Sequence, residues 1–475
     1  LRDYQPVQAS VGNGAGQRLT ACSGIPPVMT SNFTLEPRSV FPDRLHAAVQ
    51  TCTLLDVESR RDVQHAMPSD AEVDRLIFDV LGGSARQDPY PSYATLVSEA
   101  PVHRSSALDM WFVSSYDTAK HVLHDPRFGR GRGSMLGQIG DPEAGERSGA
   151  MRQQARNMLF ADPPEHTRLR SLVSRAFTPR RIEGLRSSIS TLLEPLLDHV
   201  ADAGEVDLLD ALAFRFPVAV IGELVGVPED DRDQFRSLVR VSTAMIEASP
   251  DLAALESAEQ AMSTMSSYFG DLVAQRTAAP RNDLISAMVQ VDDGGDRLTT
   301  DEIISTAILL FAAGFETTTN LIGNGTLCLL RNPDQMERLR THPEHAATAV
   351  EEMLRFESPV QLDARSALVD ADIAGTPVPA GTSVVTLLGA ANRDPAVYQS
   401  PDLFKVDRVP NHPLSFGWGI HHCLGANLAR LEGQIVFSRL LERFRMVEAV
   451  GPDPVWRPSV TLRGLEELRI AVRPT

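Results

Sequence analysis

Apolar residues recur at helical spacing over most of the chain beyond about residue 73. This spacing predicts helices over residues 88–99, 117–123, 181–200, 208–225 and 229–275. A capping box, Thr299 to Glu302, precedes the longest apolar run, which reaches about Arg331. Runs of β-branched and aromatic residues predict short strands over 109–116, 380–388 and 468–472. The pattern therefore predicts a mainly α fold with small β-sheets.

Two stretches lack this periodicity. Residues 1–72 are rich in Gly, Ser, Pro and Thr, apart from a possible short helix over 44–55. We interpret 1–72 as an N-terminal extension, largely disordered or a mis-assigned start, and 73–475 as a single domain. Residues 128–161 contain the run Gly129-Arg-Gly-Arg-Gly133 and no clear period, which indicates a long mobile loop. This run could bind phosphate, but a flexible lid over a pocket is the favoured interpretation.

Composition narrows the class of protein. The chain has 475 residues, 43% of them hydrophobic, so it can bury a large core. A formal charge of −17 argues against general nucleic-acid binding. The 4 cysteines are too scattered for a disulfide framework, which favours a reducing compartment, the cytoplasm. Because we find neither an apolar run of membrane-spanning length nor a secretory signal, we expect no association with a membrane.

One cysteine stands out because of its surroundings. Cys423 lies between a glycine-punctuated loop, which includes Gly417, and a run with helical apolar spacing from Leu424 onward. A helix N-terminus favours a thiolate, and Gly417 and Gly425 leave space for a large flat group. Taken alone, Cys423 could also be a small buried hydrophobe. A zinc site built on His421, His422 and Cys423 is set aside, because adjacent residues cannot all point at one ion.

The long apolar helix also carries polar groups where burial is expected. Its window Ala313-Gly-Phe-Glu-Thr places Glu316 and Thr317 beside Gly314, where a small ligand could be accommodated and protons relayed. Elsewhere, His166 and Arg170 are four residues apart and so share a helix face, which suits a dianionic partner.

These motifs carry a family resemblance. Residues 416–425 match the pattern Phe-Gly-x-Gly-x-His-x-Cys-x-Gly, and the stretch resembles the haem-binding signature of the bacterial-type soluble cytochrome P450 monooxygenases. The resemblance implies the cytochrome P450 fold with haem b (iron protoporphyrin IX) as cofactor and Cys423 as the iron ligand. It also implies cofactor contacts for the rest of the loop, namely Phe416, Gly417, His421 and Gly425.

The resemblance assigns roles to the other motifs too. It implies that His166, Arg170, Arg365 and His421 reach the haem propionates. Residues 313–317 match the family's oxygen-activation motif, with Ala313 and Gly314 facing the haem and Glu316 and Thr317 as the catalytic pair. Glu352 and Arg355 match its Glu-x-x-Arg motif, with Arg408 as a candidate third partner.

The implied activity inserts one oxygen atom of dioxygen into a hydrophobic organic substrate, by hydroxylation or epoxidation. Electrons would come from NAD(P)H through a separate ferredoxin reductase and ferredoxin, and the enzyme is expected to be a monomer in secondary metabolism. A cluster of arginines is the candidate docking patch for an acidic partner: Arg168, Arg175, Arg180 and Arg181.

Two other functions are open to the same motifs: a haem-thiolate sensor of gases or ligands, and a peroxide-driven peroxygenase. The intact pair of Glu316 and Thr317 argues against both. We expect the substrate pocket to be formed by residues 128–161, 235–265, 310, 313, 360–362 and 460–462.

Overall fold

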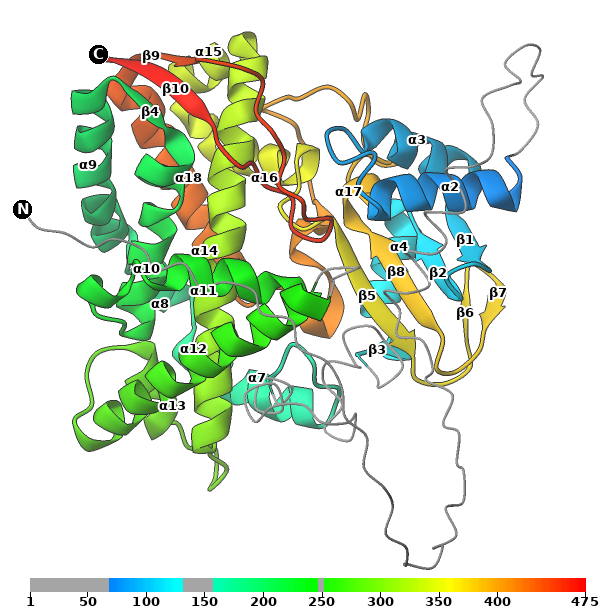
Figure 1. The fold of residues 1–475 in the computed structure, drawn as a ribbon, viewed down its shortest axis with the longest axis horizontal. Helices are drawn as coiled ribbons and strands as arrows, with labels where there is room; N and C mark the ends of the chain where they lie inside the picture. Colours follow the sequence, from blue (N-terminus) through cyan, green and yellow to red (C-terminus); the bar gives the residue numbers. More distant parts are fainter. Residues whose placement is uncertain (1–67, 131–156, 247–251) are drawn as a thin grey trace, which may run out of the picture. The chain divides into compact units, whose positions relative to one another are not determined.

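The computed structural model describes residues 68–130, 157–246 and 252–475, which fold as one unit with helices as the main element (Figure 1). The predicted helix over 44–55 and most of the predicted loop lie outside the described residues. The α-helices of the described part are α2 Asp70–Leu81, α3 Tyr90–Glu99, α4 Tyr116–His124, α7 Glu165–Ala176, α8 Pro179–Glu183, α9 Arg186–Ala203, α10 Arg215–Val225, α11 Phe235–Ser242, α12 Leu252–Ala278, α13 Leu284–Gln290, α14 Thr300–Arg331, α15 Pro333–Thr341, α16 Ala346–Phe356, α17 Leu388–Ala391 and α18 Ala426–Arg443.

Short helical turns and small sheets complete the described part. The turns are η1 Leu209–Ala213, η2 Glu229–Asp231, η3 Thr243–Ile246, η4 Pro343–His345, η5 Leu414–Phe416 and η6 Gly419–His421. The strands are β1 Val102–Ser105, β2 Met110–Val113, β3 Phe128–Gly129, β4 Glu205–Asp207, β5 Leu362–Ala367, β6 Ala371–Ile373, β7 Thr376–Val378, β8 Ser383–Leu387, β9 Phe444–Ala449 and β10 Arg469–Pro474. The prediction of a mainly α fold with small sheets is confirmed.

The largest sheet has the strand order β1-β2-β8-β5-β3, in which only β2 and β8 run parallel. The predicted loop over residues 128–161 does not begin at Phe128, because Phe128 and Gly129 form strand β3. Phe128 pairs with Ala367 and Gly129 with Ser366, because their backbone groups complete the free edge of β5. The sheet lies beside α2 and α3, opposite the large helical layer (Figure 1).

Helix α14 runs through the middle of the helical layer and packs against α10, α12 and α18 (Figure 1). Its 32 residues span about 48 Å. The predicted capping box is confirmed: the Thr299 amide donates to Glu302 Oε2 over 2.8 Å, and the Glu302 amide donates to the Thr299 hydroxyl over 3.3 Å. Buried rings of Phe311 and Phe315 then anchor the helix in the core, with centroids 5.7 Å apart.

A buried ion network joins α16 to the loop before Cys423. The Arg355 guanidinium donates to both oxygens of the fully buried Glu352 over 2.7 and 2.8 Å. Arg408 Nε donates to Glu352 Oε2 over 2.9 Å, so the prediction that Arg408 completes this network is confirmed. The buried carboxylate of Glu352 is stable only when cations or other donors bind its oxygens. Because Arg408 is one of these donors, the network fixes the segment around Arg408 to helix α16.

None of the described helices combines the length and the apolar character that crossing a membrane requires.

Replacing Arg408 with alanine should destabilise the protein, because Glu352 loses one of two buried cations. We expect Arg408→Ala to lower the free energy of unfolding by about 3 kcal/mol in urea titrations followed by circular dichroism. Arg338→Ala is the matched control, since Arg338 pairs with Asp407 at the surface, and should cost less than about 1 kcal/mol. Equal losses in both variants would contradict the role given to the network.

Candidate functional site

A cavity of about 420 Å³ lies between α14, α18 and the loop that carries Cys423. Every site residue predicted from the sequence lines it except Arg365, which follows the lining residues Asp363 and Ala364 on β5. The expected pocket segments contribute too, including Val239, Leu310 and Leu462. The sequence motifs therefore meet at one place, although His166 and Gly425 are 259 positions apart in the chain.

The loop before α18 presents the cysteine to this cavity. Gly417 and Gly419 adopt φ values of 68° and 72°, which glycine tolerates without strain. A side chain at Gly419 would also meet the carbonyl oxygen of Leu123 at 2.4 Å, so this position has no space for one. The Cys423 amide donates to the Phe416 carbonyl over 2.9 Å and closes the loop. The glycines thus allow the tight path that turns Cys423 inward.

Cys423 is surrounded by protein, yet its surface remains accessible because it faces the cavity. Burial raises the pKa of the Cys423 thiol, while the amides of Gly425 and Ala426 and the nearby Arg170 oppose this shift. Helix α18 begins at Ala426, beyond the cysteine. The amide groups at the start of the helix favour the thiolate, as expected, but the desolvation of the buried sulfur is the larger effect.

Predicted anion-binding side chains gather beside Cys423. The rings of His166 and His421 have centroids 4.3 Å apart, and within the described part of the chain the buried Nε2 atoms of both have no hydrogen-bond partner. Arg365 is only 1% exposed, and its Nη2 has no partner either. Arg170 donates through Nη2 to the His422 carbonyl over 2.7 Å. The group is rich in nitrogen donors and short of acceptors.

Arg130 is a member of this group that the sequence reasoning missed. Its side chain is 4% exposed, and Nη1 donates to Asp363 Oδ1 over 2.6 Å and to the Ala364 carbonyl over 2.8 Å. Arg365 binds the same carboxylate over 2.7 Å. Arg130 belongs to the Gly129–Gly133 run that the sequence analysis singled out. It is a buried arginine that directly follows the short strand β3.

The electrostatics of the group follow from its burial. Burial lowers the pKa of His421 far below its usual range, and the positive charges of Arg130 and Arg365 lower it further. Burial also lowers the pKa of His166, with Arg170 as the second cause. Both imidazoles are thus held neutral beside permanently charged guanidinium groups. A ligand with two carboxylates would supply the acceptors that these donors lack.

Helix α14 forms the opposite wall of the cavity. The Thr317 hydroxyl donates to the Ala313 carbonyl over 2.8 Å, and the Thr318 hydroxyl donates to the Gly314 carbonyl over 3.0 Å. Gly314 lies where a side chain would meet Ile221 at 3.0 Å. Small residues and a hydroxyl therefore face the cavity across from the sulfur.

Glu316, which the sequence predicts to relay protons with Thr317, is held in place by a cation. Its carboxylate forms a buried ion pair with Arg457, and the two side chains are 7% and 10% exposed. Sequence reasoning missed Arg457, because it lies in the C-terminal segment outside any motif. The carboxylate of Glu316 is therefore bound to the buried Arg457.

Comparison with known proteins places these features in a family. The family model for cytochrome P450 matches residues 103–463. Cytochrome P450 107B1 of Saccharopolyspora erythraea is 43% identical over 411 residues, which cover 84% of this chain and 98% of that protein. The cytochrome P450 monooxygenase PikC of Streptomyces venezuelae is 41% identical, with 84% and 94% of the two chains covered.

The fold agrees with the sequence match. The structure of P450BioI in complex with an acyl carrier protein ligated to hexadec-9Z-enoic acid has a TM-score of 0.77 and 38% identity. The match covers 82% of this chain and 100% of that chain.

The ion pair of Glu316 and Arg457 predicts a stability effect that depends on which partner is removed. Arg457→Met should lower the free energy of unfolding by about 3 kcal/mol, because it leaves the Glu316 carboxylate buried without a cation. The double variant Glu316→Gln with Arg457→Met should recover most of this loss in the same urea titration. A double variant that is as unstable as the single one would contradict the pairing.

Proposed function

The chain belongs to the cytochrome P450 family and is a haem-dependent monooxygenase, and we propose that it oxidises an apolar organic substrate held in the cavity between Cys423 and Thr317. The observation that carries the proposal is that an accessible cysteine sulfur, a set of unpartnered donors and a hydroxyl-bearing helix line one cavity. One oxygen atom of dioxygen enters the substrate and the other leaves as water.

The residues of the cavity fit a haem. Cys423 would supply a sulfur ligand to the iron, while His166, Arg170, Arg365 and His421 would supply donors for two propionates. The positive charge of the haem iron next to the Cys423 sulfur would offset the desolvation that otherwise disfavours the thiolate. The bound haem supplies oxygen activation, which electron donation from a cysteine thiolate favours.

The second face of the haem site is formed by Ala313, Gly314 and Thr317. Their small size would leave room for dioxygen on the α14 side of the cavity when haem is bound. The Thr317 hydroxyl already donates to the Ala313 carbonyl, so its oxygen is oriented to accept a hydrogen bond from the cavity side. Arg457 holds the Glu316 carboxylate one residue away, and we assign it the role of positioning this acid.

The substrate is apolar because the remaining wall offers few polar groups. Side chains from α11, α12 and α14 meet there, including Val239, Met262, Ile308 and Leu309. Burial of apolar surface then supplies most of the binding free energy. The fatty acyl group carried in the P450BioI complex is a ligand of this chemistry in a structural neighbour.

Electrons are supplied by a ferredoxin and its NAD(P)H-dependent reductase. An acidic ferredoxin suits the outer side of the cysteine loop, where Lys120 lies 4.2 Å from the centre of the Trp418 ring and Ile420 is exposed. The arginine patch expected from the sequence is less suitable. Arg168 binds Glu165, Asp296 and Glu302, so its charge is largely offset.

Cys423→Ser tests the iron ligand. The wild-type protein, reduced and exposed to carbon monoxide, should show the long-wavelength absorption band of thiolate-ligated haem. The variant should lose this band, because a serine hydroxyl remains protonated where a thiol can ionise. Cys328→Ser is the control, since Cys328 is buried outside the lining of the cavity. Retention of the band in Cys423→Ser would refute the assignment.

Thr317→Ala tests oxygen activation. Product formed per NADPH consumed, in the presence of ferredoxin and reductase, should fall by at least about tenfold, because the hydroxyl oxygen that accepts a hydrogen bond on the cavity side is removed. Thr317→Ser keeps the hydroxyl and should retain most of the coupling. Unchanged coupling in Thr317→Ala, or equal product formation from peroxide alone, would count against the monooxygenase cycle proposed for this residue.

A further inference from the structure

Two histidines and one glutamate meet at the turn between α15 and α16. His342 directly follows α15, the short turn η4 covers Pro343–His345, and α16 begins at the next residue. His342 and Glu344 are exposed, His345 is half-buried, and none of the three lines the haem cavity. One ligand atom from each side chain can be chosen so that all three atoms lie within 4.8 Å of one another. Among the described residues, this is the only such group of three metal-binding side chains.

The backbone of this turn is held by a hydrogen bond and by packing on both sides. The His345 amide donates to the His342 carbonyl over 3.0 Å, and Pro343 between them has a restricted φ. Leu339 of α15 and Val350 of α16 are buried in the same core cluster. The three side chains are therefore carried by a short segment whose two ends are both anchored in the core.

The side chains approach one another closely enough to share an ion. His342 Nδ1 and Glu344 Oε1 are 3.0 Å apart, and the ring centroids of His342 and His345 are 5.7 Å apart. Two ligands of a tetrahedral zinc ion are about 3.3 Å apart, since each lies about 2.0–2.1 Å from the metal. One pair is already close to this separation. Rotation of the exposed side chains can bring the third ligand atom to it.

The charges around the turn favour a cation. Hydrogen bonds from its own backbone amide and from His342 hold the pKa of Glu344 below its usual value, so its carboxylate is charged at neutral pH. Both arginines of α15 have other partners. Arg338 pairs with Asp407, and Arg340 donates through Nη1 to two backbone carbonyls near the end of α18. A cation at the turn would therefore meet a carboxylate whose charge these arginines do not neutralise.

We propose that His342, Glu344 and His345 bind one zinc ion at the turn between α15 and α16, with a water molecule as the fourth ligand. Imidazole and carboxylate groups together suit zinc, whereas calcium and magnesium take oxygen ligands. The bound ion joins the end of α15 to the start of α16. The site is separate from the haem cavity and does not depend on the function proposed for that cavity.

Isothermal titration calorimetry with zinc chloride tests the site in the holoenzyme, produced without a histidine tag and freed of loosely bound metal with EDTA. The wild type should bind one zinc ion per chain at this turn. Glu344→Gln and His345→Ala should each weaken the binding of this ion by at least about tenfold, because each substitution removes a direct ligand.

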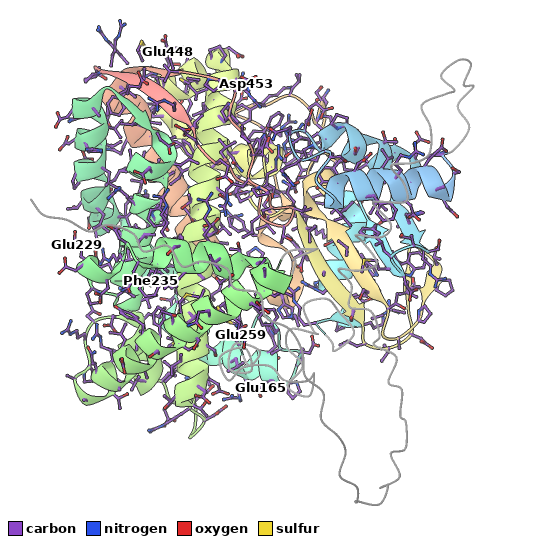
Figure 2. All side chains as sticks on the ribbon, viewed as in Figure 1. Glu165, Glu229, Phe235, Glu259, Glu448 and Asp453 are labelled. Atoms are coloured by element: carbon purple, nitrogen blue, oxygen red, sulfur yellow. The ribbon has the colours of Figure 1, made fainter. Side chains whose placement is uncertain are left out.

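Two control variants match these substitutions at exposed positions outside the cluster. Glu448→Gln changes a carboxylate on β9 (Figure 2), and His199→Ala removes an imidazole from α9. Both should bind zinc as tightly as the wild type. The absence of zinc binding in the wild type, or equal zinc affinities in the wild type and all four variants, would overturn the proposal.

X-ray absorption at the zinc edge identifies the ligands directly, because the haem iron absorbs at a different energy. With one equivalent of zinc, the wild type should show two imidazole nitrogens at about 2.0–2.1 Å, and His345→Ala should show fewer. A zinc shell of oxygen atoms alone in the wild type would overturn the proposed ligand set.

Stability provides a further readout that is independent of enzymatic activity. The ion binds ligands that only the folded turn holds together, so zinc at about 100 times its dissociation constant should raise the folding equilibrium constant about 100-fold in urea titrations. At the same zinc concentration, Glu344→Gln should gain about tenfold or less. Equal gains in the two proteins would contradict a zinc site at this turn.

Discussion

A surplus of buried hydrogen-bond donors is the constraint on which this site depends. The Nε2 atoms of His166 and His421 and the Nη2 atom of Arg365 have no hydrogen-bond partner among the described residues, and each such group costs about 1–3 kcal/mol when buried alone. Asp363 serves both Arg130 and Arg365, so it cannot satisfy the remaining donors. An anionic ligand would satisfy these groups, and we propose that the propionates of a haem are that ligand, beside the cysteine sulfur.

The rest of the described fold holds the two walls around this ligand. Helix α14 is fixed by its capping box and its buried aromatic rings, so that Thr317 faces the sulfur across the cavity. The segment that leads to α18 is fixed to α16 by Glu352, whose carboxylate binds Arg355 and Arg408. Because both walls are attached to buried networks, the cavity is rigid where chemistry occurs and apolar where the substrate enters.

Features that a few neighbouring residues determine could be predicted from the sequence. The capping box at Thr299 and the glycine loop around Cys423 are local, so spacing alone was sufficient, whereas the buried pairing of Glu352 with Arg355 came from the family resemblance. The family resemblance added Arg365 and Arg408, which no local pattern singles out. Arg130 and Arg457 were missed because their partners, Asp363 and Glu316, are far away in the chain. The balance of desolvation and helix-terminus effects at Cys423 also depends on tertiary packing, so the sequence could not determine its sign.

The central claim, that this donor cluster binds the haem carboxylates, is tested most directly by comparing reconstitution of the haem-free protein with haem and with its dimethyl ester. The ester keeps the porphyrin and the iron but removes both negative charges. Charge-assisted hydrogen bonds contribute about 1.5–3 kcal/mol each, so the wild type should bind haem at least about 100-fold more tightly than the ester. Arg365→Leu should lose much of this preference. Equal affinities of the wild type for the two compounds would contradict the account.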